Sequence, residues 1–302
     1  METQIKTIIE NYTLNALQVA LISVLVSVVT FFITNILKNY FENKLALKKL
    51  ETQHKFEQRK KIKEVIAKNK IHLINACETL NHRGWNFAIN HNENWLDTNG
   101  RYDIEKDYFH SFVYRILVLF AWVKQTQKEM IYLDTTIATK EDLEFIKFLK
   151  IFPQIFCDLT FIEGPNANGN YAVDHFFRNN FELFPDVIID NTGGVKSYAV
   201  FIGDLQITLN DLAPLYEFID QLSPLENRKR WDRFHLFHLT TIIFLNNYGY
   251  DFQITNDEKL KKILTRPKKS AYLQNYFKLL DEYHISDNKV VKRLMSIANK
   301  IP

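Results

Sequence analysis

The feature that most constrains this chain is a charge-free segment near its N-terminus. Residues Leu14–Leu37, LNALQVALISVLVSVVTFFITNIL, contain no Asp, Glu, Lys or Arg. A helix rises about 1.5 Å per residue, so this segment forms a helix of roughly 36 Å, long enough to cross a hydrocarbon core of about 30 Å with some tilt. The segment therefore predicts one transmembrane helix.

The residues on either side of this segment predict that it is retained and that it sets the orientation of the chain. The leader Met1–Glu10 has one Lys against two Glu, and no small-x-small cleavage motif ends the segment, unlike a secretory signal peptide. Basic residues then dominate positions 38–63. Because segments rich in Lys and Arg stay in the cytoplasm, we expect residues 1–13 outside and the remainder inside. Abundant Asn, Ile, Lys and Phe suit an AT-rich genome, so we expect a bacterial inner membrane.

The rest of the chain predicts a mainly α fold. It has only 8 Gly and 7 Pro in 302 residues, with long periodic apolar runs. Residues 38–61 read as a basic, solvated stalk helix, because their apolar residues keep no heptad. A first cytosolic helical part covers 62–162 and a second covers 171–302, divided by the loop EGPNANGN at Glu163–Asn170. The short apolar runs at 187–189 and 198–202 predict at most one β-hairpin.

Two clusters of turn and cap residues predict where particular helices begin. Thr139 followed by Asp142 predicts an N-cap for the helix that contains Pro153, which should kink or end it. Ser223-Pro224-Leu225-Glu226 has the form of a capping box, with proline at the first helical position. We therefore expect one helix from Ser223 to about Asn247, and another that starts near Asn210.

Known catalytic motifs and cofactor motifs are missing from the sequence. Neither GxGxxG nor GxxxxGK[ST] occurs, nor do GxSxG or HExxH. Cys77 and Cys157 have no neighbouring Cys or His at metal-ligand spacing, so we expect buried thiols rather than ligands. No cofactor and no metal site is predicted, and the chain is more consistent with a non-enzyme.

The one pattern that suggests catalysis lies on the helix expected after Ser223. Arg230, Arg233, His235 and His238 give Arg-to-His spacings of five residues, as in helical ribonucleases of the HEPN superfamily, where Arg and His from two subunits converge on a phosphodiester. Aromatic residues follow both arginines in place of the usual polar residue, so the pattern falls short of a family resemblance. The alternative is that both histidines pack under aromatic neighbours; as a metal pair they lack a third ligand.

Two further pairs are weaker candidates for binding. Trp85 and Trp95 flank the Asn-rich loop at 90–100, and aromatic side chains are enriched at binding surfaces. Asp174 and His175 follow the EGPNANGN loop and would form an acid/base pair if the loop lined a pocket. Half-buried packing and ordinary surface polarity are the respective alternatives.

These observations leave two hypotheses for the function. The first is a single-pass membrane protein whose cytosolic helical domain senses an unidentified cytosolic protein or small-molecule trigger, as in membrane-acting effectors of bacterial antiviral defence. The second is a membrane-anchored ribonuclease that uses the Arg/His pair on the 224–247 helix, and only this alternative makes nucleic acid a partner.

The predicted span also has one distinctive face. Small and hydroxylated residues recur at spacings of four and three, and they are Ala16, Ala20, Ser23, Ser27, Thr30 and Thr34. Small residues let helix backbones approach closely, and hydroxyl groups can form hydrogen bonds across a helix pair. We expect a homo-oligomer that associates in the bilayer through this face. Hydroxyl groups bonded within their own helix, or a face that lines a pore, are the alternatives.

Overall fold

A computed structural model describes residues 15–158, 176–226, 228–268 and 270–301, and over these residues the chain is mainly α-helical with almost no strand. The prediction of a mainly α fold is therefore confirmed. Short 3-10 turns join some of the helices. The helices are α2 (Ala16–Ile89), α3 (Asp107–Met130), α4 (Lys140–Cys157), α6 (Asn180–Leu183), α7 (Tyr198–Gly203), α8 (Leu205–Ile219), α9 (Arg230–Tyr248), α10 (Asp257–Leu264), α11 (Ser270–Glu282) and α12 (Lys289–Ala298).

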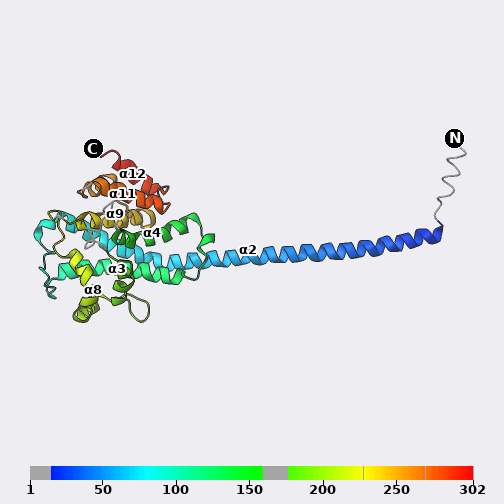
Figure 1. The fold of residues 1–302 in the computed structure, drawn as a ribbon, viewed down its shortest axis with the longest axis horizontal. Coiled ribbons are helices and arrows are strands. Elements are labelled where there is room, and N and C mark those ends of the chain that lie inside the picture. Colours follow the sequence, from blue (N-terminus) through cyan, green and yellow to red (C-terminus); the bar gives the residue numbers. More distant parts are fainter. Residues whose placement is uncertain (1–14, 159–175, 227, 269, 302) are drawn as a thin grey trace. The chain divides into compact units, whose positions relative to one another are not determined.

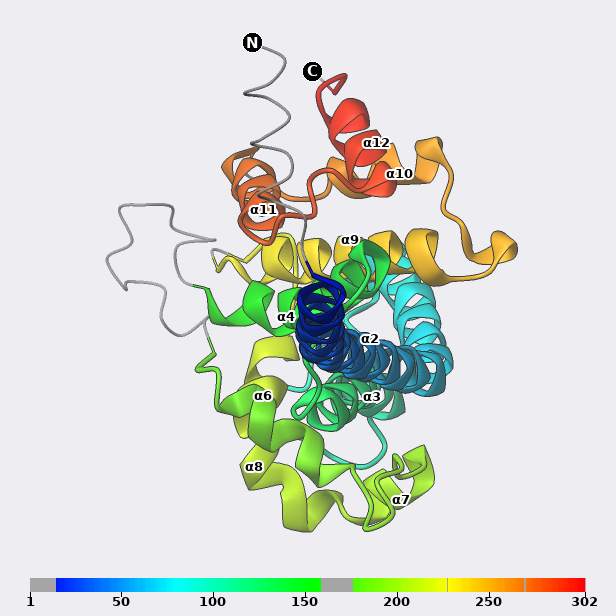
Figure 2. The same ribbon diagram turned by 90° about the vertical axis from the view of Figure 1, so that its right-hand side faces the viewer.

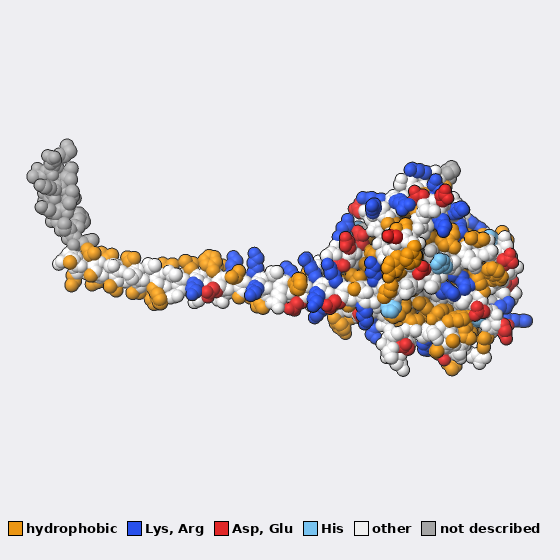
Figure 3. Space-filling model, turned by 180° about the vertical axis from the view of Figure 1, so that it is seen from behind, with side chains coloured by type: hydrophobic (Ala, Val, Ile, Leu, Met, Phe, Trp, Pro, Cys, Tyr) orange, Lys and Arg blue, Asp and Glu red, His pale blue; other side chains and the backbone are white. Residues whose placement is uncertain are grey.

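The first unit of the structure, Met1–Gln58, contains the N-terminal part of α2. Every side chain from Asn15 to Glu57 is exposed. Apolar side chains cover the start of this helix, and Lys and Arg follow further along it (Figure 3). Among the described residues, α2 is the one helix long and apolar enough to cross a membrane by length and composition.

The second unit, Arg59–Pro302, is a compact stack of helices. Figure 1 and Figure 2 agree that α10, α11 and α12 lie on one side of α9, while α8 lies beyond α3 on the other side. Helix α4 packs on both α3 and α9. Aromatic rings fill the space between them: Phe237 of α9 lies 5.7 Å from Phe120 of α3 and 4.8 Å from Phe156 of α4, measured between ring centroids.

The hydrophobic core draws on residues from both sides of the predicted boundary at Glu163–Asn170. Phe156 precedes that loop, and its ring lies 5.5 Å from the ring of Phe218, which follows it. Both side chains are buried in one continuous cluster. The loop itself lies outside the described residues.

The helix start predicted at Thr139 is confirmed. The hydroxyl of Thr139 accepts from the Asp142 backbone N–H, and the Asp142 carboxylate accepts from the Thr139 N–H, which makes a complete capping box for α4. Asn256 caps α10 by accepting from the Lys259 N–H. Helix α4 continues past Pro153 to Cys157 rather than ending there.

The two short apolar runs that could have formed a β-hairpin do not pair. The second run, Tyr198–Ile202, lies within helix α7, because the Ser197 hydroxyl caps that helix by accepting from the Val200 N–H. Strand pairing is reduced to a single antiparallel bridge between Ile189 and Val195. Two runs this short make too few ladder hydrogen bonds to outweigh local capping.

The predicted capping box at Ser223 is wrong, since α9 begins only at Arg230. The Ser223 hydroxyl accepts from the Leu225 N–H in a local turn, and the Glu226 carboxylate pairs with Arg230. Helix α8 starts at Leu205, five residues before the expected Asn210.

Candidate functional site

The arginines predicted as catalytic lie in the interior of the compact unit. Arg230 is 3% exposed, and its Nη1 donates to the carbonyl oxygens of Glu217 at 2.7 Å, Phe218 at 2.8 Å and Asp220 at 2.9 Å. Its guanidinium also pairs with the Glu226 carboxylate. These carbonyls belong to the C-terminal end of α8, where a helix leaves its last carbonyl groups without helical donors. Arg230 therefore caps the C-terminal end of α8.

Arg233 makes a similar structural contact with a different helix. It is 1% exposed, and its Nη1 donates to the carbonyl oxygen of Ile155 at 2.6 Å, near the C-terminal end of α4. A charged group this deep is retained only where it is hydrogen-bonded. Arg233 thus links α9 to α4.

The two predicted histidines are fully buried, each at 0% exposure. His235 Nδ1 donates to the Trp231 carbonyl oxygen at 2.9 Å, and His238 Nε2 pairs with Asn81 Oδ1 at 2.9 Å. Burial lowers the pKa of His235 to about 3 and holds the pKa of His238 well below its usual value. Both are therefore neutral at pH 7 and shielded from a polymeric substrate, so this geometry does not support the ribonuclease hypothesis.

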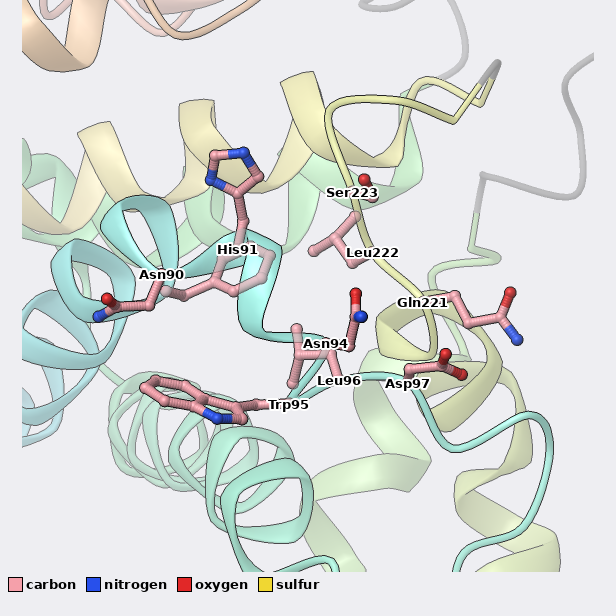
Figure 4. A pocket seen from close by; sticks show the side chains of 10 residues that line it. Asn90, His91, Asn94, Trp95, Leu96, Asp97, Gln221, Leu222 and Ser223 are labelled. Carbon is pink, nitrogen blue, oxygen red and sulfur yellow. The ribbon is translucent and has the colours of Figure 1, made fainter.

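The four residues predicted as weaker binding candidates do not come together in one site in the described part of the chain. Trp85 is half-buried, with the Arg266 guanidinium 4.5 Å from its ring and the His238 ring at 5.4 Å. Trp95 is 42% exposed, and together with His91 it lines a small cavity of about 220 Å³ (Figure 4). Asp174 and His175 lie outside the described residues.

A larger cavity, which sequence reasoning missed, lies between α2 and α3. Its volume is about 430 Å³, and its walls come from positions 72–83 of α2, positions 107–122 of α3 and Tyr198 of α7. A shallower hollow beside it shares Thr79 and two arginines with it and extends to Trp95. We call the 430 Å³ cavity the α2–α3 groove.

Two arginines line this groove, Arg83 of α2 and Arg115 of α3, and both form a hydrogen bond with Ser111. Arg83 Nη2 donates to Ser111 Oγ at 2.9 Å, and Arg115 Nη1 donates to the Ser111 carbonyl oxygen at 2.7 Å. The Arg83 guanidinium also lies 4.0 Å from the ring of Tyr108. Each guanidinium is thus held in position by neutral groups.

The positive charges of these arginines are only partly offset in the described part of the chain. Within those residues neither Arg83 nor Arg115 has a carboxylate oxygen within ion-pair distance, and burial together with the charge of Arg83 lowers the pKa of Arg115. Asp107 also lines the groove; its carboxylate accepts from the Tyr198 hydroxyl at 2.8 Å, and its negative charge acts on Arg115 without forming an ion pair. Holding two like charges together is unfavourable unless an anion or solvent screens them.

The other end of the groove is aromatic. The His72 imidazole is stacked on the Trp122 indole with ring centroids 3.9 Å apart and an angle of 6° between the planes. His72 is exposed, whereas Trp122 is half-buried. The groove thus joins a cationic end to a flat aromatic end.

This arrangement is suited to binding rather than to covalent chemistry. The Ser111 hydroxyl donates to the Tyr108 carbonyl oxygen at 3.1 Å and accepts from Arg83, so it faces no general base among the described residues. Unpaired guanidinium groups in a concave site recognise carboxylate or phosphate oxygens.

Comparison of the chain with protein-family models, with curated proteins and with solved structures finds no match.

Proposed function

We propose that this protein is a single-pass membrane protein whose compact helical unit binds a small anionic ligand in the α2–α3 groove. One observation carries the proposal: α2 is a single helix, Ala16–Ile89, whose start is charge-free and exposed and whose end supplies one wall of the groove. The candidate anchor and one wall of the candidate binding site therefore belong to the same helix.

The exposed face of the first unit supports membrane insertion. Large apolar side chains such as Leu17, Phe31 and Ile36 are exposed over most of their surface. Exposed apolar surface costs about 25 cal/mol for each Å² in water, and a bilayer removes that cost. The basic residues that follow Leu37 support an orientation with the compact unit in the cytoplasm, and the composition supports a bacterial inner membrane.

The groove supports a binding function rather than an enzymatic one. Its two guanidinium groups are positioned by Ser111 and lack carboxylate partners among the described residues. The Arg and His residues that suggested a ribonuclease are instead occupied inside the fold, as Arg230 and His235 illustrate. A trigger for this protein would then be a small anion.

The proposal is tested by locating the full chain and by measuring anion binding. After alkaline carbonate washing of membranes, we expect the chain to remain in the pellet, and a chain without residues 1–37 to be released. Titration of the full chain in detergent with sodium pyrophosphate, at constant ionic strength, should show saturable heat that Arg83→Gln with Arg115→Gln removes.

The control for the titration is Arg101→Gln, which changes an exposed arginine outside the groove lining. Carbonate release of the full chain would contradict the membrane anchor. Pyrophosphate binding that is absent from the unsubstituted chain, or that is equal in the double variant, would contradict the anion site.

A further inference from the structure

We infer that the α2–α3 groove takes a nucleoside phosphate, with its phosphate groups on Arg83 and Arg115 and its base on the Trp122 indole. The inference rests on the proposed anion-binding function and names the class of ligand. It is argued from the charge at one end of the groove, from the ring stack at the other and from the distance between them.

The phosphate end is defined by both helices. Arg83 and Arg115 come from different elements, yet both donate to Ser111, on its hydroxyl and its carbonyl oxygen respectively. A guanidinium offers five donors in a planar fork, so donors beyond these contacts remain for a ligand. Phosphate oxygens match this fork, and two guanidinium groups compensate the two negative charges that a phosphate group carries.

The base end is marked by the stacked pair. The exposed His72 ring lies parallel to Trp122 at 3.9 Å, the geometry in which a planar heterocycle contacts an indole. Because the His72 side chain is exposed, it can rotate away from Trp122. A nucleobase can then stack on the indole surface that the imidazole covers. Stacking of a nucleobase on an aromatic side chain is worth about 1–3 kcal/mol.

The spacing along α3 joins the two ends into one site. Ser111, Arg115, Val118 and Trp122 follow one another at intervals of four, three and four, and all of them line the groove, so they share a helical face. Arg115 and Trp122 are two helical turns apart, which is about 10.5 Å at 1.5 Å per residue. An extended nucleotide reaches from its phosphate to its base over a comparable length.

The size and the charge of the groove are consistent with this ligand. A volume of about 430 Å³ lies within the roughly 300–1,000 Å³ of small-molecule sites. Two arginines against one carboxylate, Asp107, give the lining a net positive charge. A purely apolar ligand would leave this charge buried without a partner.

The test compares ADP, GDP, sodium pyrophosphate and adenosine in calorimetric titrations of the full chain in detergent at constant ionic strength. We expect ADP or GDP to bind about tenfold or more tightly than pyrophosphate, and adenosine to bind weakly. Arg115→Gln should weaken both pyrophosphate and the nucleotide by about tenfold or more, since it removes a charge-assisted hydrogen bond. Trp122→Leu should weaken the nucleotide alone.

Two further variants keep the result interpretable. Arg115→Lys retains the charge but loses the planar fork, so it should bind more weakly than the unsubstituted chain even if Arg115→Gln fails to fold. Arg101→Gln should leave every affinity unchanged, because Arg101 is exposed and does not line the groove.

Each alternative outcome is distinct. Equal affinity for pyrophosphate and both nucleotides, with no effect of Trp122→Leu, would overturn the nucleotide inference and leave the anion-binding function standing. Failure of all phosphorylated compounds to bind at millimolar concentration would overturn both. Nucleotide binding that survives Arg115→Gln and Arg115→Lys unchanged would place the nucleotide elsewhere and so overturn the inference.

Discussion

Gly84 marks a close approach between α2 and α9. A Cβ atom at this position would lie 2.8 Å from the Cγ, Nδ1 and Cε1 atoms of the His238 ring, which real Cβ contacts do not reach. The ring is held by its hydrogen bond to Asn81 and by the Trp85 ring beside it. A helix interior normally disfavours glycine, so packing rather than helix propensity selects it here.

We predict that Gly84→Ala lowers the free energy of unfolding by about 1–3 kcal/mol, the usual cost of overpacking a core. This cost exceeds the gain of up to about 1 kcal/mol in helix propensity. Chemical denaturation in detergent, followed by tryptophan fluorescence, measures the difference. Gly203→Ala is the matched control, since the added Cβ would meet no atom within 4 Å apart from its own helix backbone and chain neighbours. Equal effects of both variants would contradict the prediction.

The buried histidines make stability depend on pH. His235 has its pKa lowered to about 3 from the ordinary 6.5 by burial, and the pKa of His238 is lowered in the same direction. The unfolded chain therefore binds more protons than the folded chain below pH 6.5, and stability falls as the pH decreases from there towards 3. Each histidine contributes at most about 1.4 kcal/mol for each pH unit.

This pH dependence is checked by denaturation of the full chain at pH 7.5 and at pH 5. We expect the loss of stability between the two values to be smaller in His235→Gln and smaller again in the double variant with His238→Gln. His82→Gln, which changes an exposed histidine, should retain the full loss. An unchanged loss in the double variant would show that other groups cause it.

The sequence could not assign roles to single charged residues because their partners lie far along the chain. Arg233 contacts the Ile155 carbonyl oxygen, 78 positions away, and its spacing from His238 is the same whether both are catalytic or both are buried. Arg115 was not singled out from the sequence, because it stands inside an apolar run, FVYRILVLFAW, with no polar motif around it. A search for basic residues that share a helical face with an aromatic residue, as Arg115 does with Trp122, would have singled it out.

At the scale of elements, the two predicted helix caps, at Thr139 and at Ser223, differ in outcome and give a direct comparison. Thr139 caps α4 through a reciprocal pair of bonds with Asp142, whereas the Ser223 hydroxyl only accepts from the Leu225 N–H in a turn. We predict that Thr139→Ala costs about 1 kcal/mol of unfolding free energy. Ser223→Ala should cost less, and a larger effect at Ser223 would contradict the structure.

Long helices were predictable because their hydrophobic periodicity repeats over many residues. Short elements were not predictable, because they contain too few residues to show a period. The predicted transmembrane helix from residue 16 onward and the stalk helix predicted over 38–61 both lie within α2, which continues to Ile89. The runs at 187–189 and 198–202 were too short for their pattern to decide. There the hydrogen bonds of Asp190 to the Thr192 and Gly194 N–H groups, and the cap at Ser197, determine the backbone.

The small-residue face of the proposed span carries a further prediction. Ser27 and Thr34 each donate a hydrogen bond to the carbonyl oxygen four residues earlier, at 2.8 Å and 2.7 Å. Both hydroxyl groups therefore donate within their own helix, which is one of the two alternatives to helix association. If the helices do associate through this face, close packing of their backbones must contribute most of the stabilisation.

We predict that Ala20→Ile with Ser27→Ile reduces the oligomer fraction of the full chain in detergent, measured by light scattering. The added side chains would separate the two backbones at the small-residue face. Leu21→Ile with Val28→Ile changes another face and should leave the fraction unchanged. If both pairs behave alike, association through this face is wrong.

For the whole molecule, the proposed function depends on α2, which supplies the candidate membrane span in the first unit and one wall of the groove in the second. Its charge-free start was evident in the sequence, since the absence of charge is a local property. The groove was not evident in the sequence, because it forms only when α3 packs beside α2. That packing brings Ser111 into contact with Arg83, 28 positions away in the chain. Packing between distant segments determines such a site, and hydrophobic periodicity does not specify it.

The central claim, that α2 crosses a bilayer with the compact unit inside the cell, is tested most directly by labelling single added cysteines with a membrane-impermeant maleimide. The unsubstituted chain gives the background from Cys77 and Cys157. We predict that Thr13→Cys is labelled on intact spheroplasts, that Glu42→Cys is labelled only after lysis, and that Ser27→Cys is labelled only in detergent. Labelling of Ser27→Cys without detergent, or of Glu42→Cys on intact spheroplasts, would contradict the account.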